Sequence, residues 1–381
     1  MDFGFTEEQQ AVSEAAAAIF AGRATPERVA EVERTEDRVD EALWAELARA
    51  NLLGVAVPVE HGGSGLGLTE VGLVLEQQGR RVAPVPLWAT LVLGALPLAR
   101  FGTPEQQTRW LPGVAGGQVR LSAAVAEVAA GAALRPGVEA EPDGEGWRFS
   151  GTAFAVPQGH VADRILVPAR AGTGPDAPTV VALVDPAGAG AVRRRAVSTD
   201  RQVHVHLDLD AAPVVAADVI PGGATVVTWL LERARTGLCA LQLGVAEEAV
   251  RRTAAYLNQR HQFGRPLSSF QGTMLRAADA YIDTEAIRVT TWQAAWRLDT
   301  DRPAAQAVAA AHWWASEAGQ RVVHATQHLH GGMGADIEYP IHRYFLWGKQ
   351  IELMLQGPSA ELARLGAMVA AEWHERAGTP A

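Results

Sequence analysis

The amino-acid sequence predicts an α+β fold in which an N-terminal helical domain, a small antiparallel β domain and a C-terminal four-helix bundle follow one another. Apolar residues recur at helical spacing in the first part of the chain, short β-rich runs fill roughly residues 120–220, and helical spacing returns from Val226 onward. A chain of 381 residues is too long for one compact core of average size. We therefore expect three domains, at residues 1–119, 120–222 and 223–381.

In the N-terminal region, Thr6 and Gln9 have the spacing of a capping box, which predicts a helix through about Ala21. A second helix is expected from about residue 39 to residue 50. Its predicted apolar stripe consists of Leu43, Trp44 and Leu47.

A glycine-rich stretch at residues 62–67 lacks both the G-x-G-x-x-G spacing and the Lys-Ser/Thr ending of a phosphate loop. We interpret it as a structural loop that leads into a helix capped by Thr69. A further short helix is expected to open at Pro104 and to end near Gly113.

The middle region contains short alternating or β-rich runs that are separated by Gly, Pro and Asp, as expected for a small antiparallel sheet. The predicted strands are residues 147–151, 164–167, 179–184 and 203–209. The segment Pro221-Gly222-Gly223 reads as the linker to the next domain.

The last region is helical in four long segments that are broken at residues 264–269, 299–303 and 331–340. Each segment carries apolar residues at helical spacing, so that the expected arrangement is a four-helix bundle.

Composition and charge exclude several classes of function. The net charge of −10 and the lack of a long basic run argue against nucleic acid or a membrane surface as the main partner. Cys239 is the only cysteine, so the chain can form no intrachain disulfide and no thiolate metal cluster. The sequence has no run of about 20 apolar residues and no apolar signal core after Met1, and we expect a cytoplasmic protein.

The first motif of interest is the segment Arg260–Pro266, which follows the first long helical segment. The planar guanidinium of Arg260 is suited to a phosphate or pyrophosphate. Gly264 and Pro266 are expected to turn the chain so that a second helix begins near Ser268 or Ser269.

The second motif is the segment Gln327–Gly334. Its paired glycines would let a ligand approach backbone amides closely, and Gln327 can both donate and accept hydrogen bonds. His324 and His328 have the spacing of metal ligands on a helix, but no carboxylate or cysteine is placed to complete a site, so we expect no metal.

Together the two motifs, R-x-Q-F-G-x-P followed by S-F-Q and then Q-x-x-H-G-G-x-G, resemble the acyl-CoA dehydrogenase family. The resemblance covers nearly the whole chain and implies the same helix–sheet–helix architecture. In that family these motifs hold the ADP part of FAD, largely for a neighbouring subunit. The resemblance therefore implies the following FAD-binding residues here: Arg260, Gln262, Phe263, Gln271, Gln327, Gly331, Gly332 and Gly334.

The catalytic base of the family has no obvious counterpart. Many members carry a glutamate in a Y-E-G-T turn, where this chain has Gln356, or Gly357 if the register shifts by one. Other members carry the base on the first bundle helix, at a position that matches Ala234. Glu232 is near, but two residues along a helix rotate a side chain by about 200°, and we read it as a solvated residue that is at most a displaced base.

The family's residues that bind the flavin ring also have no obvious counterpart in this chain. The stretch that resembles the family's T-E-x-x-x-G-S-D is residues 126–133, without the hydroxyl and the aspartate. Ala155 stands where relatives have a stacking tryptophan, and Pro157 stands in place of a hydroxyl donor and has no backbone N–H.

The resemblance therefore predicts a non-catalytic subunit of a heteromeric, α2β2 acyl-CoA dehydrogenase that lends ADP-side contacts to the FAD of a paralogous catalytic subunit. The implied substrate is an acyl-CoA, with a steroid-derived acyl group suggested by residues 331–340, and the implied acceptor resembles electron-transfer flavoprotein. Two alternatives remain open: a self-sufficient homo-oligomeric dehydrogenase with Glu232 as the base, and a structural oligomerisation protein without flavin.

Overall fold

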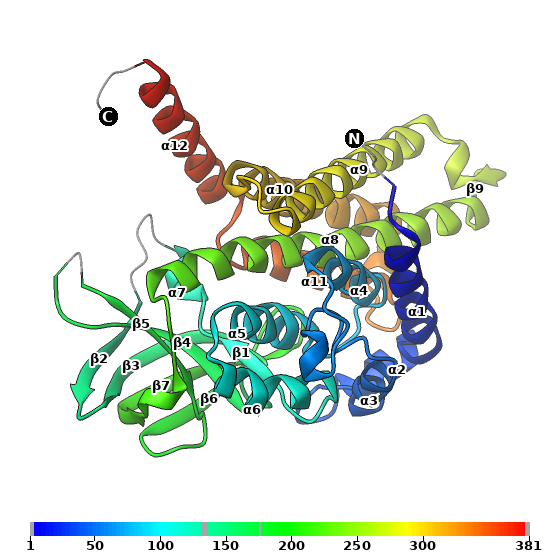
Figure 1. The fold of residues 1–381 in the computed structure, drawn as a ribbon. Coiled ribbons are helices and arrows are strands. Elements are labelled where there is room, and N and C mark those ends of the chain that lie inside the picture. The colour runs from blue at the N-terminus through cyan, green and yellow to red at the C-terminus, as the bar shows by residue number, and fades with distance from the viewer. Residues whose placement is uncertain (1–3, 131–135, 175–176, 378–381) are drawn as a thin grey trace.

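The computed structural model describes residues 4–130, 136–174 and 177–377, and its elements follow the predicted order of helices, sheet and helices. Figure 1 shows the sheet at one end of the molecule, beside the N-terminal helices, with the C-terminal helices crossing over both. The predicted fold class is confirmed. The predicted domain boundaries fall between α6 and β1 and between β8 and α8, and the division itself stays a prediction.

The N-terminal region is built from short helices and turns. They are α1 (Glu7–Arg23), α2 (Pro26–Val32), α3 (Glu41–Arg49), η1 (Val59–His61), α4 (Leu68–Arg81), η2 (Trp88–Ala95), α5 (Leu96–Phe101) and α6 (Pro104–Ala115). The predicted capping box is present, since the Thr6 hydroxyl accepts a hydrogen bond from the Gln9 amide and the Gln9 side chain accepts one from the Thr6 amide. The predicted stripe of α3 is buried.

The prediction that Thr69 caps the fourth helix is wrong. The N-cap is Gly67, and the helix begins at Leu68. The amides of Leu68 and Thr69 instead donate to the carboxylate of Asp299, each at 2.8 Å. Because Asp299 lies more than two hundred residues along the chain, local sequence reasoning could not find this cap.

Within the described residues, eight strands form one sheet in the order β6-β7-β3-β2-β4-β5-β8, with β1 beside β4. The strands are β1 (Leu121–Ala123), β2 (Val138–Asp143), β3 (Gly146–Pro157), β4 (Arg164–Arg170), β5 (Thr179–Val184), β6 (Ala191–Val197), β7 (Val203–Val214) and β8 (Val219–Ile220); helix α7 (Ala126–Ala130) follows β1. The four predicted runs all lie in strands, whereas β1, β2, β6 and β8 were not predicted. The sheet is mixed rather than purely antiparallel, because β4 runs parallel to β1 and to β2.

The C-terminal region consists of α8 (Ala224–Gln259), α9 (Gln271–Asp299), α10 (Ala305–Leu329), α11 (Ile341–Leu353) and α12 (Pro358–Ala377). The predicted fourth segment is therefore two helices, and Figure 1 shows α12 extending away from the rest of the bundle. Ser268 and Ser269, near which a second helix was expected to begin, lie in a 3-10 turn, η4 (Leu267–Ser269), and α9 begins two residues after Ser269, at Gln271.

Helices α4 and α8 cross in backbone contact, and glycines make this possible. A Cβ at Gly79 would stand 2.1 Å from the carbonyl oxygen of Leu241, and one at Gly244 would stand 1.9 Å from that of Glu76. Real side chains do not approach a backbone atom so closely, so both glycines are required by the crossing.

We expect Gly244→Ala to lower the free energy of unfolding by about 1–3 kcal/mol, as other overpacked interiors do, because the added methyl group would force α4 and α8 apart. Denaturant titration measures this change. Gly22→Ala in α1 is the control, since no described atom lies within 4 Å of its Cβ position, and it should not lower the free energy of unfolding, because alanine is the better helix former by up to about 1 kcal/mol. Equal stability of the two variants would contradict the close crossing.

Candidate functional site

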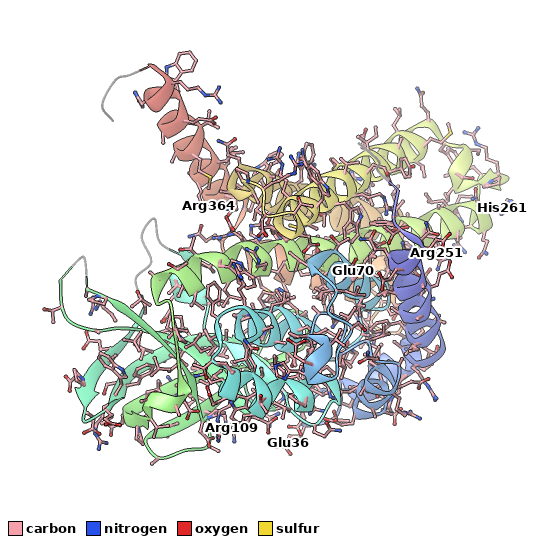
Figure 2. The ribbon with its side chains drawn as sticks, viewed as in Figure 1. Glu36, Glu70, Arg109, Arg251, His261 and Arg364 are labelled. Carbon is pink, nitrogen blue, oxygen red and sulfur yellow. The ribbon has the colours of Figure 1, made fainter. Side chains whose placement is uncertain are left out.

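The first predicted motif forms a tight hairpin at the end of α8. Strands β9 (His261–Gln262) and β10 (Arg265–Pro266) pair antiparallel. Phe263 and Gly264, the two residues between them, have φ of 51° and 78°. A two-residue hairpin turn with positive φ at both positions is the type I′ geometry, which explains the glycine. Figure 2 shows His261 at the outer tip of the molecule, where this hairpin protrudes.

The side chains of this hairpin are presented to the outside. Phe263 is 93% exposed, an unusual state for a phenylalanine. Arg260 and Gln262 are exposed as well, and so is Gln271 at the start of α9. The guanidinium of Arg265 lies 4.0 Å above the ring of Phe270, which fixes the base of the hairpin.

The second predicted motif ends α10 and continues as a 3-10 turn, η5 (Gly331–Ala335). No described atom lies within 4 Å of a Cβ built on Gly331 or Gly332, whereas one on Gly334 would stand 2.4 Å from the carbonyl oxygen of Gln327. The side-chain oxygen of Gln327 is buried and finds no hydrogen-bond partner among the described residues. An open glycine pair beside an unused buried acceptor fits a site for a polar ligand.

Tyr256 brings the two motifs together. Its ring stacks on His330 at a centroid distance of 4.5 Å, and its hydroxyl donates to the His330 carbonyl at 3.4 Å. His330 is buried and donates from Nδ1 to the carbonyl of Thr326. Sequence reasoning missed this pair, although Tyr256 lies one helical turn before Arg260 and His330 lies inside the second motif. The motifs therefore occupy the same end of the bundle.

The turn that would carry a catalytic glutamate connects α11 to α12. Leu355 and Gln356 both adopt left-handed conformations, with φ of 57° and 88°. Such positions are uncommon for non-glycine residues. Gln356 is half-buried, and its amide cannot accept a proton at neutral pH. The turn between α11 and α12 therefore has two left-handed residues but no carboxylate that could act as a base.

A buried group of charges lies just beyond this turn, where α12 meets α8 and α10. Glu361 is completely buried, and its carboxylate forms ion pairs of 2.9 Å with Arg235 of α8 and with Arg364 of α12. His312 of α10 has its Nδ1 atom 3.6 Å from the same carboxylate. Figure 2 shows Arg364 at the foot of α12, where that helix leaves the bundle.

The surroundings keep Glu361 ionised, and they keep the neighbouring His312 and Cys239 uncharged. Burial would raise the pKa of Glu361, but His312 and the guanidinium groups of Arg364 and Arg235 lower it to about 2. Burial lowers the pKa of the His312 imidazole, which keeps it neutral at pH 7. Burial also raises the pKa of the nearby Cys239 thiol, so that Cys239 is unreactive.

The helical position that the resemblance matches to a base, Ala234, and the displaced candidate, Glu232, both lie on α8 next to this cluster. Ala234 is fully buried and directly precedes Arg235. Glu232 is half-buried, and one of its oxygens lies 3.4 Å from the guanidinium of Arg233. Burial raises the pKa of Glu232, opposed by Arg233 first and then by Arg364 and Arg235. Glu232 is therefore less solvated than the sequence indicated.

At Ala155, the position that the resemblance assigns to the flavin ring, strand β3 contains a bulge. Ala155 has φ of 49°, its amide donates to His206 Nδ1, and its carbonyl accepts from His204 Nδ1. The carbonyl of Pro157 accepts from the Ser122 hydroxyl at 2.6 Å. This surface offers no large ring at Ala155 and no amide donor at Pro157. Of the related stretch 126–133, residues 131–133 lie outside the described residues.

Across the part of the chain that the structure describes, no group of three or more His, Cys, Asp or Glu side chains is arranged to hold a metal ion. His324 packs its ring against Phe345 at a centroid distance of 4.8 Å. None of the described helices is both long and apolar enough to cross a membrane.

Two family models match the chain. "Acyl-CoA dehydrogenase, N-terminal domain" matches residues 6–118, and "Acyl-CoA dehydrogenase, C-terminal domain" matches residues 222–369. Acyl-CoA dehydrogenase FadE27 of Mycobacterium tuberculosis is 40% identical over 379 residues, which cover 97% of this chain and 99% of that protein. FadE28 of the same organism is 34% identical over 367 residues, covering 96% and 98%.

Solved structures agree with this similarity. A variant of the Tcur3481-Tcur3483 steroid ACAD is 48% identical, with a TM-score of 0.89 and coverage of 96% of this chain and 98% of that chain. The ChsE4-ChsE5 complex from Mycobacterium tuberculosis is 39% identical, with a TM-score of 0.90 and full coverage of both chains, 100% each. Butyryl-CoA dehydrogenase from Megasphaera elsdenii, 23% identical with a TM-score of 0.88, covers 97% of this chain and 100% of its own, and shares the fold.

We expect Glu361→Gln to lower the free energy of unfolding at pH 7 by about 3–5 kcal/mol, because it leaves Arg235 buried without its counter-charge. The folded pKa of about 2 lies below the ordinary 4.5, so the carboxylate stabilises the fold fully above pH 4.5 and this stabilisation is lost as the pH falls toward 2. Denaturant titration across that pH range should therefore give a shallower pH dependence for the variant.

Glu317→Gln is the control for this prediction, since Glu317 pairs with Arg321 at 3.1 Å on the surface of α10. Its cost should stay below about 1 kcal/mol. A Glu361→Gln protein as stable as this control would mean that the buried pair contributes nothing to the attachment of α12.

Proposed function

The chain belongs to the acyl-CoA dehydrogenase family, and on this premise we propose that it is the subunit without a catalytic base in a heteromeric enzyme. It contributes the ADP side of an FAD site whose flavin ring and base belong to a paralogous subunit. The family typically binds FAD, which would supply the acceptor for the hydride from the β-carbon of the acyl-CoA while a base removes the α-proton.

The geometry of the two motifs supports the ADP side of this proposal. Arg260 is free to pair with a phosphate, and Gln262, Phe263 and Gln271 stand beside it on the exposed hairpin and at the start of α9. From η5, the backbone of Gly331 and Gly332 is open to a ligand, and Gln327 offers its unused oxygen. Gly334 would serve indirectly, by allowing the turn to fold back on the end of α10.

The observation that carries the proposal is that the buried carboxylate of Glu361 is held in ion pairs. A base must be a free proton acceptor beside the α-carbon. Glu361 is instead engaged by Arg235 and Arg364, and its pKa of about 2 makes it a very weak base. Ala234 and Gln356, at the two positions where relatives carry the base, have no carboxylate.

The length of α8 supports the sharing of one FAD between two subunits. Arg235 and Arg260 are about 25 residues apart on this helix, which corresponds to about 38 Å at about 1.5 Å per residue. The distance between the hairpin and the base position on α8 supports an ADP motif that serves the cofactor of another chain.

The relatives support the nature of the partner. The ChsE4-ChsE5 structure is a complex of two different chains, and Tcur3481-Tcur3483 is a steroid ACAD. We therefore propose a paralogous catalytic subunit as partner, an α2β2 assembly, a steroid-derived acyl-CoA as substrate and an acceptor like electron-transfer flavoprotein.

The test is to co-express the chain with a paralogous subunit and to measure FAD per protomer in the pure complex and in each chain alone. We expect one FAD per pair and none on this chain alone. Flavin on this chain alone together with acyl-CoA oxidation would overturn the proposal, and a colourless complex would favour the structural oligomerisation protein.

At the residue level, Arg260→Ala in this chain is expected to reduce the FAD content of the complex at least about tenfold, since a charge-assisted phosphate contact contributes about 1.5–3 kcal/mol. The absorbance of the purified complex at 450 nm measures the FAD content. Arg109→Ala is the control, because Arg109 is exposed on α6 and pairs only at 3.4 Å with Asp218. Equal FAD content in both variants would exclude Arg260 from the site.

A displaced base is the second candidate, and the raised pKa of Glu232 is the observation that favours it. Under our proposal Glu232→Gln leaves turnover of the complex unchanged, because the proton acceptor belongs to the partner. Steady-state turnover with an acyl-CoA and an artificial electron acceptor measures this. A loss of about a hundredfold or more, the usual range for a missing general base, would instead establish the displaced base.

A further inference from the structure

The space beside the vestigial base position is filled by the side chain of Trp88. This tryptophan opens the π-helical segment η2, whose eight residues are all buried. Its indole N–H donates to the carbonyl of Ala234 at 3.0 Å, and only 5% of its surface is exposed. Residue 88 thus meets α8 at the very residue that matches the base position of relatives.

Helix α8 is shaped to receive this indole. A Cβ built on Gly237 would stand 3.0 Å and 3.2 Å from two atoms of the Trp88 ring, and 3.2 Å from Val92. These distances are tighter than ordinary side-chain contacts, so that the absence of a side chain at Gly237 creates the slot that the ring occupies. The widened turns of η2 bring Trp88 and Val92 to the same slot. π-Helical segments are rare and occur frequently at functional sites.

The chemistry of the reaction identifies what this slot would otherwise hold. A base that removes the α-proton must lie within hydrogen-bonding reach of the α-carbon. In relatives whose base matches Ala234, the acyl group must therefore pass beside this part of α8. In this chain the indole contacts α8 at the Ala234 carbonyl and at Gly237, and Val92 also reaches Gly237.

We propose that Trp88 closes the acyl-binding space of this chain, so that the heteromeric complex binds acyl-CoA only at the partner's site, at most once per pair of subunits. This inference rests on the proposed function, because it assumes a partner that holds the working site. Beyond the proposed function, the inference identifies Trp88 as a residue that determines where substrate binds. The chain is excluded from substrate binding by a packed side chain as well as by its missing base.

Trp88→Gly tests the inference in the assembled complex. Octanoyl-CoA is the probe, and its binding is measured by equilibrium dialysis without oxygen and without an electron acceptor. We expect at most one equivalent per pair in the unmodified complex and one additional equivalent in Trp88→Gly. Indole measures whether the slot has opened, because it should bind the variant, raise its melting temperature and compete with the additional octanoyl-CoA.

Trp44→Gly is the matched control. Trp44 is equally buried, and its indole N–H donates to the carbonyl of Gly117 at 2.9 Å, but it lies on α3 and not against α8. This variant should lose stability without gaining an equivalent of octanoyl-CoA. A gain in both variants would show that any large cavity takes up the probe, and it would overturn the assignment to Trp88.

Two further outcomes would also overturn the inference. One is two equivalents of octanoyl-CoA per pair in the unmodified complex, which requires no variant at all. The other is a Trp88→Gly complex that binds indole but gains no octanoyl-CoA. Should Trp88→Gly not fold, Trp88→Val with butyryl-CoA carries the same test. The FAD count in the same samples separates the two ideas, since two FAD per pair contradicts the proposed function whatever the acyl-CoA count.

Discussion

The close crossing of α4 and α8 is the constraint on which the rest of the structure depends. Gly79 and Gly244 allow the two backbones to touch, and this contact fixes α8 against the N-terminal helices. Nearly all of α8 from Val226 to Ala249 is buried, so the helix is the axis around which the domains pack. Every feature of functional interest then takes its place from α8: the closed slot at Gly237, the ion pair of Arg235 and the hairpin beyond Arg260.

These features divide the helix into a part that is sealed and a part that is open. Around Arg235 the side chains are buried, and the charges of Arg235 and Glu361 are paired with each other. Near Tyr256 and Arg260 the helix leaves the core, and polar and aromatic side chains are exposed on the hairpin that follows. A protein that offers one end of a cofactor site while sealing the other needs this contrast, because an unpaired charge or an empty space in the sealed part would cost several kcal/mol.

The sequence was sufficient where the determining contacts are local. The Thr6 capping box, the apolar stripe of α3 and the glycine turn of the hairpin each depend on residues within a few positions of one another. It was insufficient where partners are remote. Asp299 caps α4, Glu361 pairs with Arg235, Tyr256 stacks on His330 and Trp88 bonds to Ala234. No periodicity or spacing reports such pairs, because they are set by how the helices pack.

The tryptophan slot has a simple energetic rationale. A cavity that accepts an acyl group is unfavourable while it is empty, since its lining loses both dispersion contacts and burial. A catalytic subunit recovers this free energy each time substrate binds, but a subunit that never binds substrate does not. Filling the space with a large indole contributes about 3–5 kcal/mol relative to an alanine, and the bond from Trp88 to Ala234 satisfies the polar N–H. Under the proposed function, the absence of a base and the closure of the slot are physically coupled, because packing alone favours the larger side chain in a subunit that binds no substrate.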